Sequence, residues 1–132
     1  DGLYRHSPLC EAAWGRGNGF PALGLAWALS EWPDDHPAKR ELIAEFQKHI
    51  AALKPHQDRA TGCWHQVIDH PESYDEYSCT CMIGFAMQRG IGRGWVAKEE
   101  DGACVVRASR EHNRAERTRF ARGTHRGFRS GG

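Results

Sequence analysis

Hydrophobic positions recur at helical spacing in three parts of the chain. Residues 19–32 are apolar nearly all round before Pro33 interrupts the pattern, which predicts a helix buried on most faces. Residues 75–89 are mostly apolar in the same way and predict a second helix of this kind. Because a helix without a polar face must be covered on several sides, we expect both helices in the interior of an all-α assembly.

An amphipathic segment lies between these two apolar segments. Asp34 or Asp35 is expected as its N-cap, with Pro37 in the first turn. Apolar side chains then follow one stripe, namely Leu42, Ile43, Phe46, Ile50 and Leu53. Charged side chains fall mostly on the opposite face, which predicts an outer helix with one side in solvent.

Two short motifs precede the apolar helices at an offset of 60 residues. "DGLYRH" begins at Asp1 and "TGCWHQ" begins at Thr61, and each combines a glycine turn with an aromatic residue. A repeated unit of loop, inner helix and outer helix is typical of an α/α toroid, in which a ring of inner helices is covered by outer ones. A small three-helix bundle with coincidental glycine–aromatic turns fits the same periodicity.

The heptad "WGRGNGF", Trp14 to Phe20, carries the candidate chemistry. Its three glycines predict a loop rather than a helix, placed at the end of the inner ring where a cavity would open. Trp14 and Phe20 offer flat apolar faces for a sugar ring, and Arg16 offers a forked donor for a carboxylate. Neutral hydrogen-bonding groups are added by His6, Asn18, His65 and Gln66. This combination suits an acidic sugar, whereas the alternative is two core aromatic residues and a surface arginine.

Composition narrows the class of protein. The chain has 132 residues, 39% of them hydrophobic, which predicts one globular domain. We expect neither a membrane span nor a signal peptide, because no apolar run reaches about 18 residues and the chain opens without a basic segment. Five cysteines without a CxxC pair favour a reducing compartment, hence a cytoplasmic location. Neither a nucleotide-binding glycine motif nor an HExxH motif occurs, so we expect no cofactor and no metal.

Charge divides the chain into two unlike parts. Residues 104–132 carry eight arginines and two acidic side chains, whereas residues 1–103 carry ten basic and fifteen acidic ones. We therefore expect residues 97–132 to form a basic tail apart from the domain, either disordered or derived from a shifted reading frame. On a helix, Arg107, Arg110, Arg114 and Arg117 would share a face and could neutralise phosphates. A non-catalytic sugar- or nucleic-acid-binding remnant is therefore the alternative function, with nucleic acid the less expected partner.

Residues 1–96 resemble the unsaturated glucuronyl and rhamnogalacturonyl hydrolases of glycoside hydrolase families 88 and 105. The resemblance rests on "WGRGNGF", the apolar helix after it and "TGCWHQV" about forty residues later. It implies an (α/α)₆ barrel, a six-hairpin toroid, of which this chain would hold about two hairpins. It also implies removal of a 4,5-unsaturated uronic acid from oligosaccharides by hydration of the C4=C5 vinyl ether, with one aspartate as proton donor and then base.

The same resemblance implies roles for individual residues. Trp14, Arg16 and Phe20 match a substrate-site tryptophan, an arginine that holds the uronate carboxylate, and a second aromatic residue that is more often tryptophan. His6 matches a histidine before the motif, and His65 and Gln66 lie in the later loop.

Departures from the family pattern also have consequences. The catalytic aspartate of the family lies upstream of the position matched by Asp1, so the catalytic residue is unknown here and we expect no turnover. The likeness is expected to end near Val96. With only two hairpins, the inner helices would lack neighbours, and the chain would self-associate through exposed apolar helices.

Overall fold

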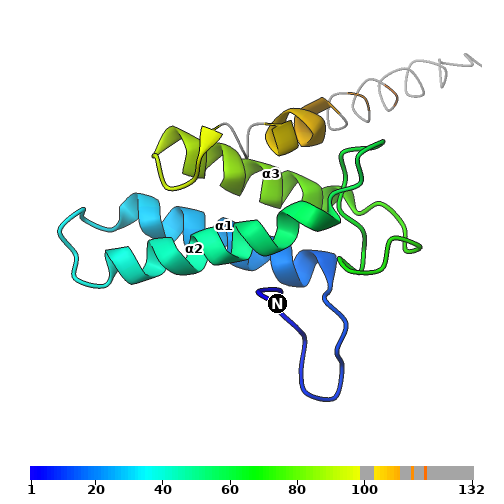
Figure 1. The fold of residues 1–132 in the computed structure, drawn as a ribbon, viewed down its shortest axis with the longest axis horizontal. Coiled ribbons are helices and arrows are strands. Elements are labelled where there is room, and N and C mark those ends of the chain that lie inside the picture. Colours follow the sequence, from blue (N-terminus) through cyan, green and yellow to red (C-terminus); the bar gives the residue numbers. More distant parts are fainter. Residues whose placement is uncertain (99–102, 111–113, 115–117, 119–132) are drawn as a thin grey trace, which may run out of the picture.

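A computed structural model describes residues 1–98 and 103–110, together with positions 114 and 118. Its named helices are α1 (Gly15–Glu31), α2 (Lys39–Leu53), the short 3₁₀ helix η1 (Lys54–His56) and α3 (Tyr77–Gly92). Residues 103–110 are helical as well. Helices α1 and α3 lie side by side and run in the same direction, while α2 runs back against them (Figure 1). The described part of the chain is therefore helical, with β-structure limited to isolated bridges.

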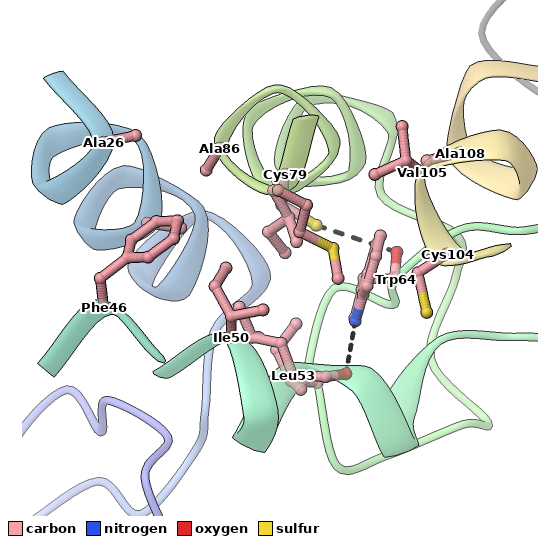
Figure 2. Close-up of a cluster of buried hydrophobic side chains, with 14 of the residues drawn as sticks. Ala26, Phe46, Ile50, Leu53, Trp64, Cys79, Ala86, Cys104, Val105 and Ala108 are labelled. Atoms are coloured by element: carbon pink, nitrogen blue, oxygen red, sulfur yellow. Dashed lines mark hydrogen bonds between the residues drawn. The ribbon is translucent and has the colours of Figure 1, made fainter. Parts of the chain in front are cut away.

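The core forms where α2, α3 and residues 103–110 meet around Trp64 (Figure 2). Trp64 is fully buried, and its indole nitrogen donates a hydrogen bond to the carbonyl oxygen of Leu53 at 2.8 Å. This bond ties the loop before α3 to the end of α2 and satisfies the one polar atom of the ring. The buried apolar side chains around it include Phe46, Ile50, Leu53, Ile83, Ala86 and Met87.

Residues 103–110, which follow the domain boundary expected at Val96, contribute side chains to this core. Cys104, Val105 and Ala108 are buried within the cluster (Figure 2). The charge pattern of the sequence does not reveal this apolar stripe, because arginines lie next to its residues. The expectation of a disordered or frame-shifted tail otherwise falls on residues outside the described ranges, apart from the helical positions 114 and 118.

The heptad expected as a loop is instead the first turns of α1. A Cβ atom on Gly15 would lie 2.7 Å from the carbonyl oxygen of His65, and one on Gly19 would lie 3.2 Å from the Cα atom of Cys79. The two glycines therefore let the helix approach both the loop before α3 and the backbone of α3 itself. Tertiary packing outweighs their low helix propensity, which costs about 1 kcal/mol each.

The two glycine–aromatic turns are equivalent in structure as well as in sequence. Gly2 and Gly62 both have positive φ, at 88° and 77°. A Cβ atom on Gly2 would lie 2.8 Å from that of Ala52 in α2, and one on Gly62 would lie 2.6 Å from the carbonyl oxygen of Arg107. Each turn thus packs on the outer helix that follows its own inner helix, so residues 103–110 take the place in the second unit that α2 takes in the first.

The aromatic residue of each turn is anchored in the same way. The backbone N–H of Tyr4 donates to Oδ1 of Asn18 in α1 at 2.8 Å. The backbone N–H of Trp64 donates to Oγ1 of Thr80 in α3 at 2.9 Å. The chain therefore consists of two hairpins of inner and outer helix, as the repeat predicts.

The ends of the helices differ from the sequence-based expectation. Helix α2 begins at Lys39, and neither aspartate before it caps the helix. Instead, Asp34 pairs with the Lys39 ammonium at 2.6 Å, and that ammonium also donates to the carbonyl oxygen of Trp32 at 2.7 Å. The carboxylate is therefore used to hold the turn between α1 and α2.

Helix α3 is capped by Glu76, a residue that the sequence did not indicate. Its carboxylate accepts hydrogen bonds from the backbone N–H groups of Ser78 at 3.1 Å and Cys79 at 2.7 Å. Burial opposes ionisation of this carboxyl, but the hydrogen bonds outweigh burial and lower its pKa.

We expect Glu76→Ala to lower the free energy of unfolding by about 1 kcal/mol, because two N–H groups at the start of α3 lose their acceptor. Chemical denaturation at pH 7 measures this change, with Glu45→Ala on the exposed face of α2 as the neutral control. Because the folded pKa of Glu76 is lowered, its contribution is present above the ordinary value of 4.5 and is lost as the pH falls through the folded value. A difference between wild type and Glu76→Ala that persists at pH 2 would contradict this assignment.

We expect Gly19→Ala to destabilise the chain by about 1 to 3 kcal/mol, because the new methyl group would press on the backbone of α3. Gly92→Ala is the matched control, since a Cβ atom there meets no atom within 4 Å. Equal stability of the two variants in urea titrations would show that close approach of α1 and α3 does not require Gly19.

Candidate functional site

The amino end of α1 is fixed against the loop that precedes α3. The backbone N–H of Gly15 donates to the carbonyl oxygen of Gln66 at 2.7 Å, and Trp14 forms an antiparallel bridge with Val67. The N–H of Ile68 donates to the carbonyl oxygen of Ala13 at 2.8 Å. Two segments that lie about fifty residues apart in the chain therefore form one rigid surface.

Trp14, Arg16 and Phe20 are all exposed at this end of α1. Phe20 is 63% exposed, which is unusual for a phenylalanine and leaves its ring face free for a ligand. Within the described part of the chain, Arg16 has neither a hydrogen bond nor an ion pair from its side chain. No side chain caps α1, and its first turn carries no acidic residue. The positive end of the helix dipole and the Arg16 guanidinium therefore both favour an anion here.

Asn18, which is also among the expected site residues, does not join this exposed set. It is fully buried. Its Oδ1 accepts the N–H of Tyr4 at 2.8 Å, and its Nδ2 donates to the carbonyl oxygens of Tyr4 at 3.0 Å and Trp14 at 2.9 Å. These bonds hold the segment before α1 and use both N–H groups of the Asn18 amide.

His65 is buried beneath the surface that Trp14 helps to form. Its Nδ1 lies 2.9 Å from the carbonyl oxygen of Ser73 and 3.4 Å from the Asp75 carboxylate, and its Nε2 lies 3.9 Å from the Asp58 carboxylate. The imidazole is therefore held within the loop and its ring makes no exposed face. His65 positions the loop rather than reaching a ligand directly.

Gln66 retains an unused acceptor. Its backbone is fixed by the bond to Gly15 and by its own N–H donating to Tyr74 at 2.9 Å. Its side-chain Oε1 is buried and has no hydrogen-bond partner among the described residues. A buried amide oxygen without a donor is costly, so this atom is a candidate acceptor for a hydroxyl group or a water molecule.

His6 lies in an exposed turn before α1, and no contact in the described structure joins it to Trp14 or Arg16. Its neighbour Arg5, which the sequence did not single out, makes the connection between the turn and the loop. The Arg5 guanidinium donates to Asp1 at 2.6 Å, to Asp69 at 2.8 Å and to the carbonyl oxygen of Glu11. Burial alone would raise the pKa of Asp69, but the bond from Arg5 lowers it.

Of the arginines expected on the basic face of a nucleic-acid binder, Arg107, Arg110 and Arg114 lie in the described part of the chain, and Arg114 is exposed. Arg107 turns inward, where its Nε donates to Gln57 at 2.9 Å and its Nη2 lies 3.2 Å from the Cys104 sulfur. Arg110 is exposed, and Arg117 lies outside the described residues.

A pocket of the described structure lies away from the heptad. A pocket of about 490 Å³ lies between α2 and the segment after α3, and no predicted site residue lines it. Among the described residues, no three His, Cys, Asp or Glu side chains are placed to hold a metal ion. No helix in this part of the chain is long and apolar enough to cross a membrane.

Comparison with known proteins identifies similar chains. The sequence model of Glycosyl Hydrolase Family 88 matches residues 5–110, which extends the likeness beyond Val96. Over 100 residues the chain is 33% identical to the unsaturated rhamnogalacturonyl hydrolase YesR of Bacillus subtilis, covering 67% of this chain and 29% of that protein. It is 31% identical over 83 residues to an unsaturated 3S-rhamnoglycuronyl hydrolase of an Alteromonas species, covering 61% of this chain and 20% of that one.

Solved structures show the same architecture. The crystal structure of a possible GH105 member from Salmonella enterica superimposes with a TM-score of 0.74 at 26% identity, covering 83% of this chain and 31% of that chain. A family 105 glycoside hydrolase from C. acetobutylicum superimposes with a TM-score of 0.73 at 27% identity, with the same coverage. The fold is therefore part of the six-hairpin helical fold, and the chain spans between 20 and 31% of the length of these four relatives.

We expect Asn18→Ala to lower the free energy of unfolding by about 2 to 3 kcal/mol, because the backbone N–H and carbonyl oxygen of Tyr4 both lose their partner. Arg16→Ala should change it by less than about 0.5 kcal/mol, since the exposed guanidinium has no partner within the described structure. Urea denaturation of the two variants separates a structural residue from an exposed one. A large loss of stability in Arg16→Ala would contradict its assignment as a free side chain.

Proposed function

Because this chain belongs to Glycosyl Hydrolase Family 88, we propose that it provides the surface that binds the unsaturated uronic acid at the non-reducing end of an acidic oligosaccharide. The proposal rests on the Arg16 guanidinium, which lies exposed and without a partner at the uncapped amino end of α1. It is supported by the resemblance of "WGRGNGF" to the substrate site of the unsaturated glycuronyl hydrolases.

Arg16 is the group that would hold the uronate carboxylate. A guanidinium binds a carboxylate through two parallel N–H···O bonds, and the helix dipole adds to the attraction. Because none of the described residues pairs with Arg16, binding does not require any ion pair of the described structure to be broken. The backbone bond from Gly15 to Gln66 fixes the helix end, so little conformational freedom is lost on binding.

The aromatic side chains would bind the sugar ring itself. Trp14 is held by its bridge to Val67 and is 38% exposed, so one part of its indole packs on the chain and another faces outward. Phe20 lies one and a half turns further along α1, on the exposed side. Gln66 Oε1, buried without a donor, would accept a hydrogen bond from a sugar hydroxyl.

The reaction class proposed for the complete enzyme is hydration of the C4=C5 double bond. A proton is added to C4 and a water oxygen to C5, and the resulting hemiketal opens and releases the rest of the oligosaccharide. This step needs an acid–base aspartate, which the resemblance places upstream of Asp1. We therefore propose that these 132 residues bind the substrate without turning it over.

Titration of the chain with an unsaturated uronyl disaccharide, followed by NMR, tests the binding role. We expect Arg16→Ala to weaken binding by about thirtyfold, or about 2 kcal/mol, because the carboxylate loses its charged partner. Arg40→Ala, an exposed arginine at the start of α2, is the matched control and should bind as the wild type does. Equal affinities of Arg16→Ala and Arg40→Ala for the disaccharide would show that Arg16 does not bind the uronate carboxylate.

The same titration followed in the ultraviolet tests the absence of turnover, because hydration destroys the absorbance of the conjugated double bond. We expect the absorbance to stay constant over hours at saturating chain concentration. A decay that depends on the concentration of the chain would show that a residue within these 132 supplies the acid–base function.

A further inference from the structure

The buried imidazole of His65 lies between acceptor groups on both of its ring nitrogens. Its Nδ1 lies 2.9 Å from the carbonyl oxygen of Ser73 and 3.4 Å from the Asp75 carboxylate. Its Nε2 faces the Asp58 carboxylate at 3.9 Å. The His65 side chain is 8% exposed, whereas those of Asp58 and Asp75 are 32% and 27% exposed. Two partly exposed carboxylates, one from before His65 in the chain and one from after it, therefore meet at one buried ring.

The acceptors assign the hydrogen atoms of the ring. A neutral imidazole has one N–H donor and one bare nitrogen. Because the Ser73 carbonyl oxygen lies within hydrogen-bond distance of Nδ1 and can only accept, Nδ1 carries the hydrogen in the neutral ring. The bare Nε2 then faces the negative carboxylate of Asp58, which gives no attraction. A proton added at Nε2 turns this contact into an ion pair and also places a positive charge beside Asp75.

The Asp58 carboxylate is held in place where it faces Nε2. Its Oδ1 accepts the backbone N–H groups of Ala60 at 2.6 Å and Thr61 at 2.9 Å, and its Oδ2 is the atom that faces the imidazole. The bonds from Thr61 and Ala60 lower the pKa of the Asp58 carboxyl against the effect of burial, and the charge of His65 lowers it further. One oxygen therefore holds the turn, and the other is directed at His65.

Other ionisable groups near His65 are either acidic or neutral. The pKa of Glu72 is lowered by its 2.7 Å bond to His70 and, to a smaller extent, by the charge of His65. On the side of α1 the loop meets Gly15, which has no side chain, and beyond it Cys79 of α3. Burial raises the pKa of the Cys79 thiol, so this group stays uncharged. A positive charge on His65 is therefore balanced by carboxylates of its own loop.

His65 lies where this loop holds the amino end of α1. A Cβ atom on Gly15 would lie 2.7 Å from the carbonyl oxygen of His65. The next residue, Gln66, accepts the backbone N–H of Gly15 at 2.7 Å. On its other side, His65 forms an antiparallel bridge with Asp75. A change in how firmly His65 is held thus reaches Gly15 through a single peptide unit, and Arg16 is the residue that follows.

We propose that His65 is a positioning residue that works in its protonated form. A proton on Nε2 joins the carboxylates of Asp58 and Asp75 through the imidazolium and so braces the loop against the amino end of α1. The proton is taken from water and stays on Nε2, and no other bond forms or breaks. Deprotonation removes the ion pair with Asp58 and leaves the hydrogen bond to Ser73. The bridge rests on this geometry alone, whereas its effect on sugar binding rests on the proposed function.

The two charges set the pH range in which the bridge exists. The contribution of the imidazolium is present at low pH and is lost as the pH rises and Nε2 gives up its proton. The contribution of the Asp58 carboxylate is present above its ordinary value of 3.8 and is lost as the pH falls through its lowered pKa. We therefore expect the bridge at about pH 5.5 and its loss at about pH 8.5.

A double-mutant cycle followed by urea denaturation tests the bridge without any ligand. Asp58→Asn keeps an oxygen for the N–H groups of Ala60 and Thr61 but removes the charge that faces Nε2, and His65→Gln removes the ring. We expect the coupling between the two changes to alter the unfolding equilibrium constant by about threefold at about pH 5.5 and to vanish at about pH 8.5. A coupling of equal size at both pH values, or none at either, would overturn the proposal.

An NMR titration tests the positioning role and starts from the wild-type chain, so it does not depend on the stability of a variant. The imidazole nitrogens of His65 and the backbone amide of Gly15 should shift with the same midpoint, because the loop transmits the proton to α1. His70→Gln removes an exposed histidine of the same loop and should leave this step unchanged, whereas His65→Gln should abolish it. A Gly15 resonance that does not follow His65 would overturn the proposal.

Titration with the unsaturated uronyl disaccharide at the same two pH values tests the consequence for the site. We expect the wild type and His70→Gln to bind about twofold more tightly at the lower pH, within the limit set by the energy of the bridge. His65→Gln should bind equally at both, because Arg16 stays charged throughout. A pH dependence that survives in His65→Gln would overturn the positioning role. Absence of binding at both pH values would refute the proposed sugar binding, and the urea cycle and the Gly15 titration would still decide the bridge.

Discussion

The close approach of α1 to α3 is the contact on which the rest of this structure depends. Gly15 and Gly19 bring the backbone of α1 against the carbonyl oxygen of His65 and the backbone at Cys79, where a side chain larger than hydrogen would collide. This approach aligns the amino ends of the two inner helices and allows the bond between Gly15 and Gln66. It also explains why a glycine-rich heptad forms a helix, since the packing gained exceeds the propensity lost.

The site follows from this contact. Once the first turn of α1 is fixed, side chains at neighbouring positions point in different directions around the helix. Asn18 points inward and holds the segment before α1, while Arg16 and Phe20 point outward. One heptad therefore contains both the residue that anchors the loop and the residues proposed to bind a ligand. The Arg5–Asp69 pair joins the turn before α1 to the loop before α3, in which Gln66 Oε1 lies buried without a hydrogen-bond partner among the described residues.

The repeat builds the described structure from two similar hairpins. Each glycine–aromatic turn packs on its own outer helix, so each hairpin is stabilised locally. The contact between α1 and α3 then joins the two hairpins through their inner helices. On another side of α1 the rings of Phe20 and Trp27 lie exposed, and a Cβ atom on Gly24 would meet nothing within 4 Å.

The sequence by itself determined the helical class, the two-hairpin repeat, the three apolar segments and the motif that identifies the family, because spacing and composition are local properties of the chain. Tertiary structure decided that the heptad is helical, that Asn18 is an anchor, that Glu76 caps α3 and that residues 103–110 complete the core. Each of these outcomes depends on contacts between segments far apart in sequence: Gly15 with His65, Asn18 with Tyr4, and Cys104 with Gln57. No local pattern encodes such a contact, since its energy exists only when both segments are in place.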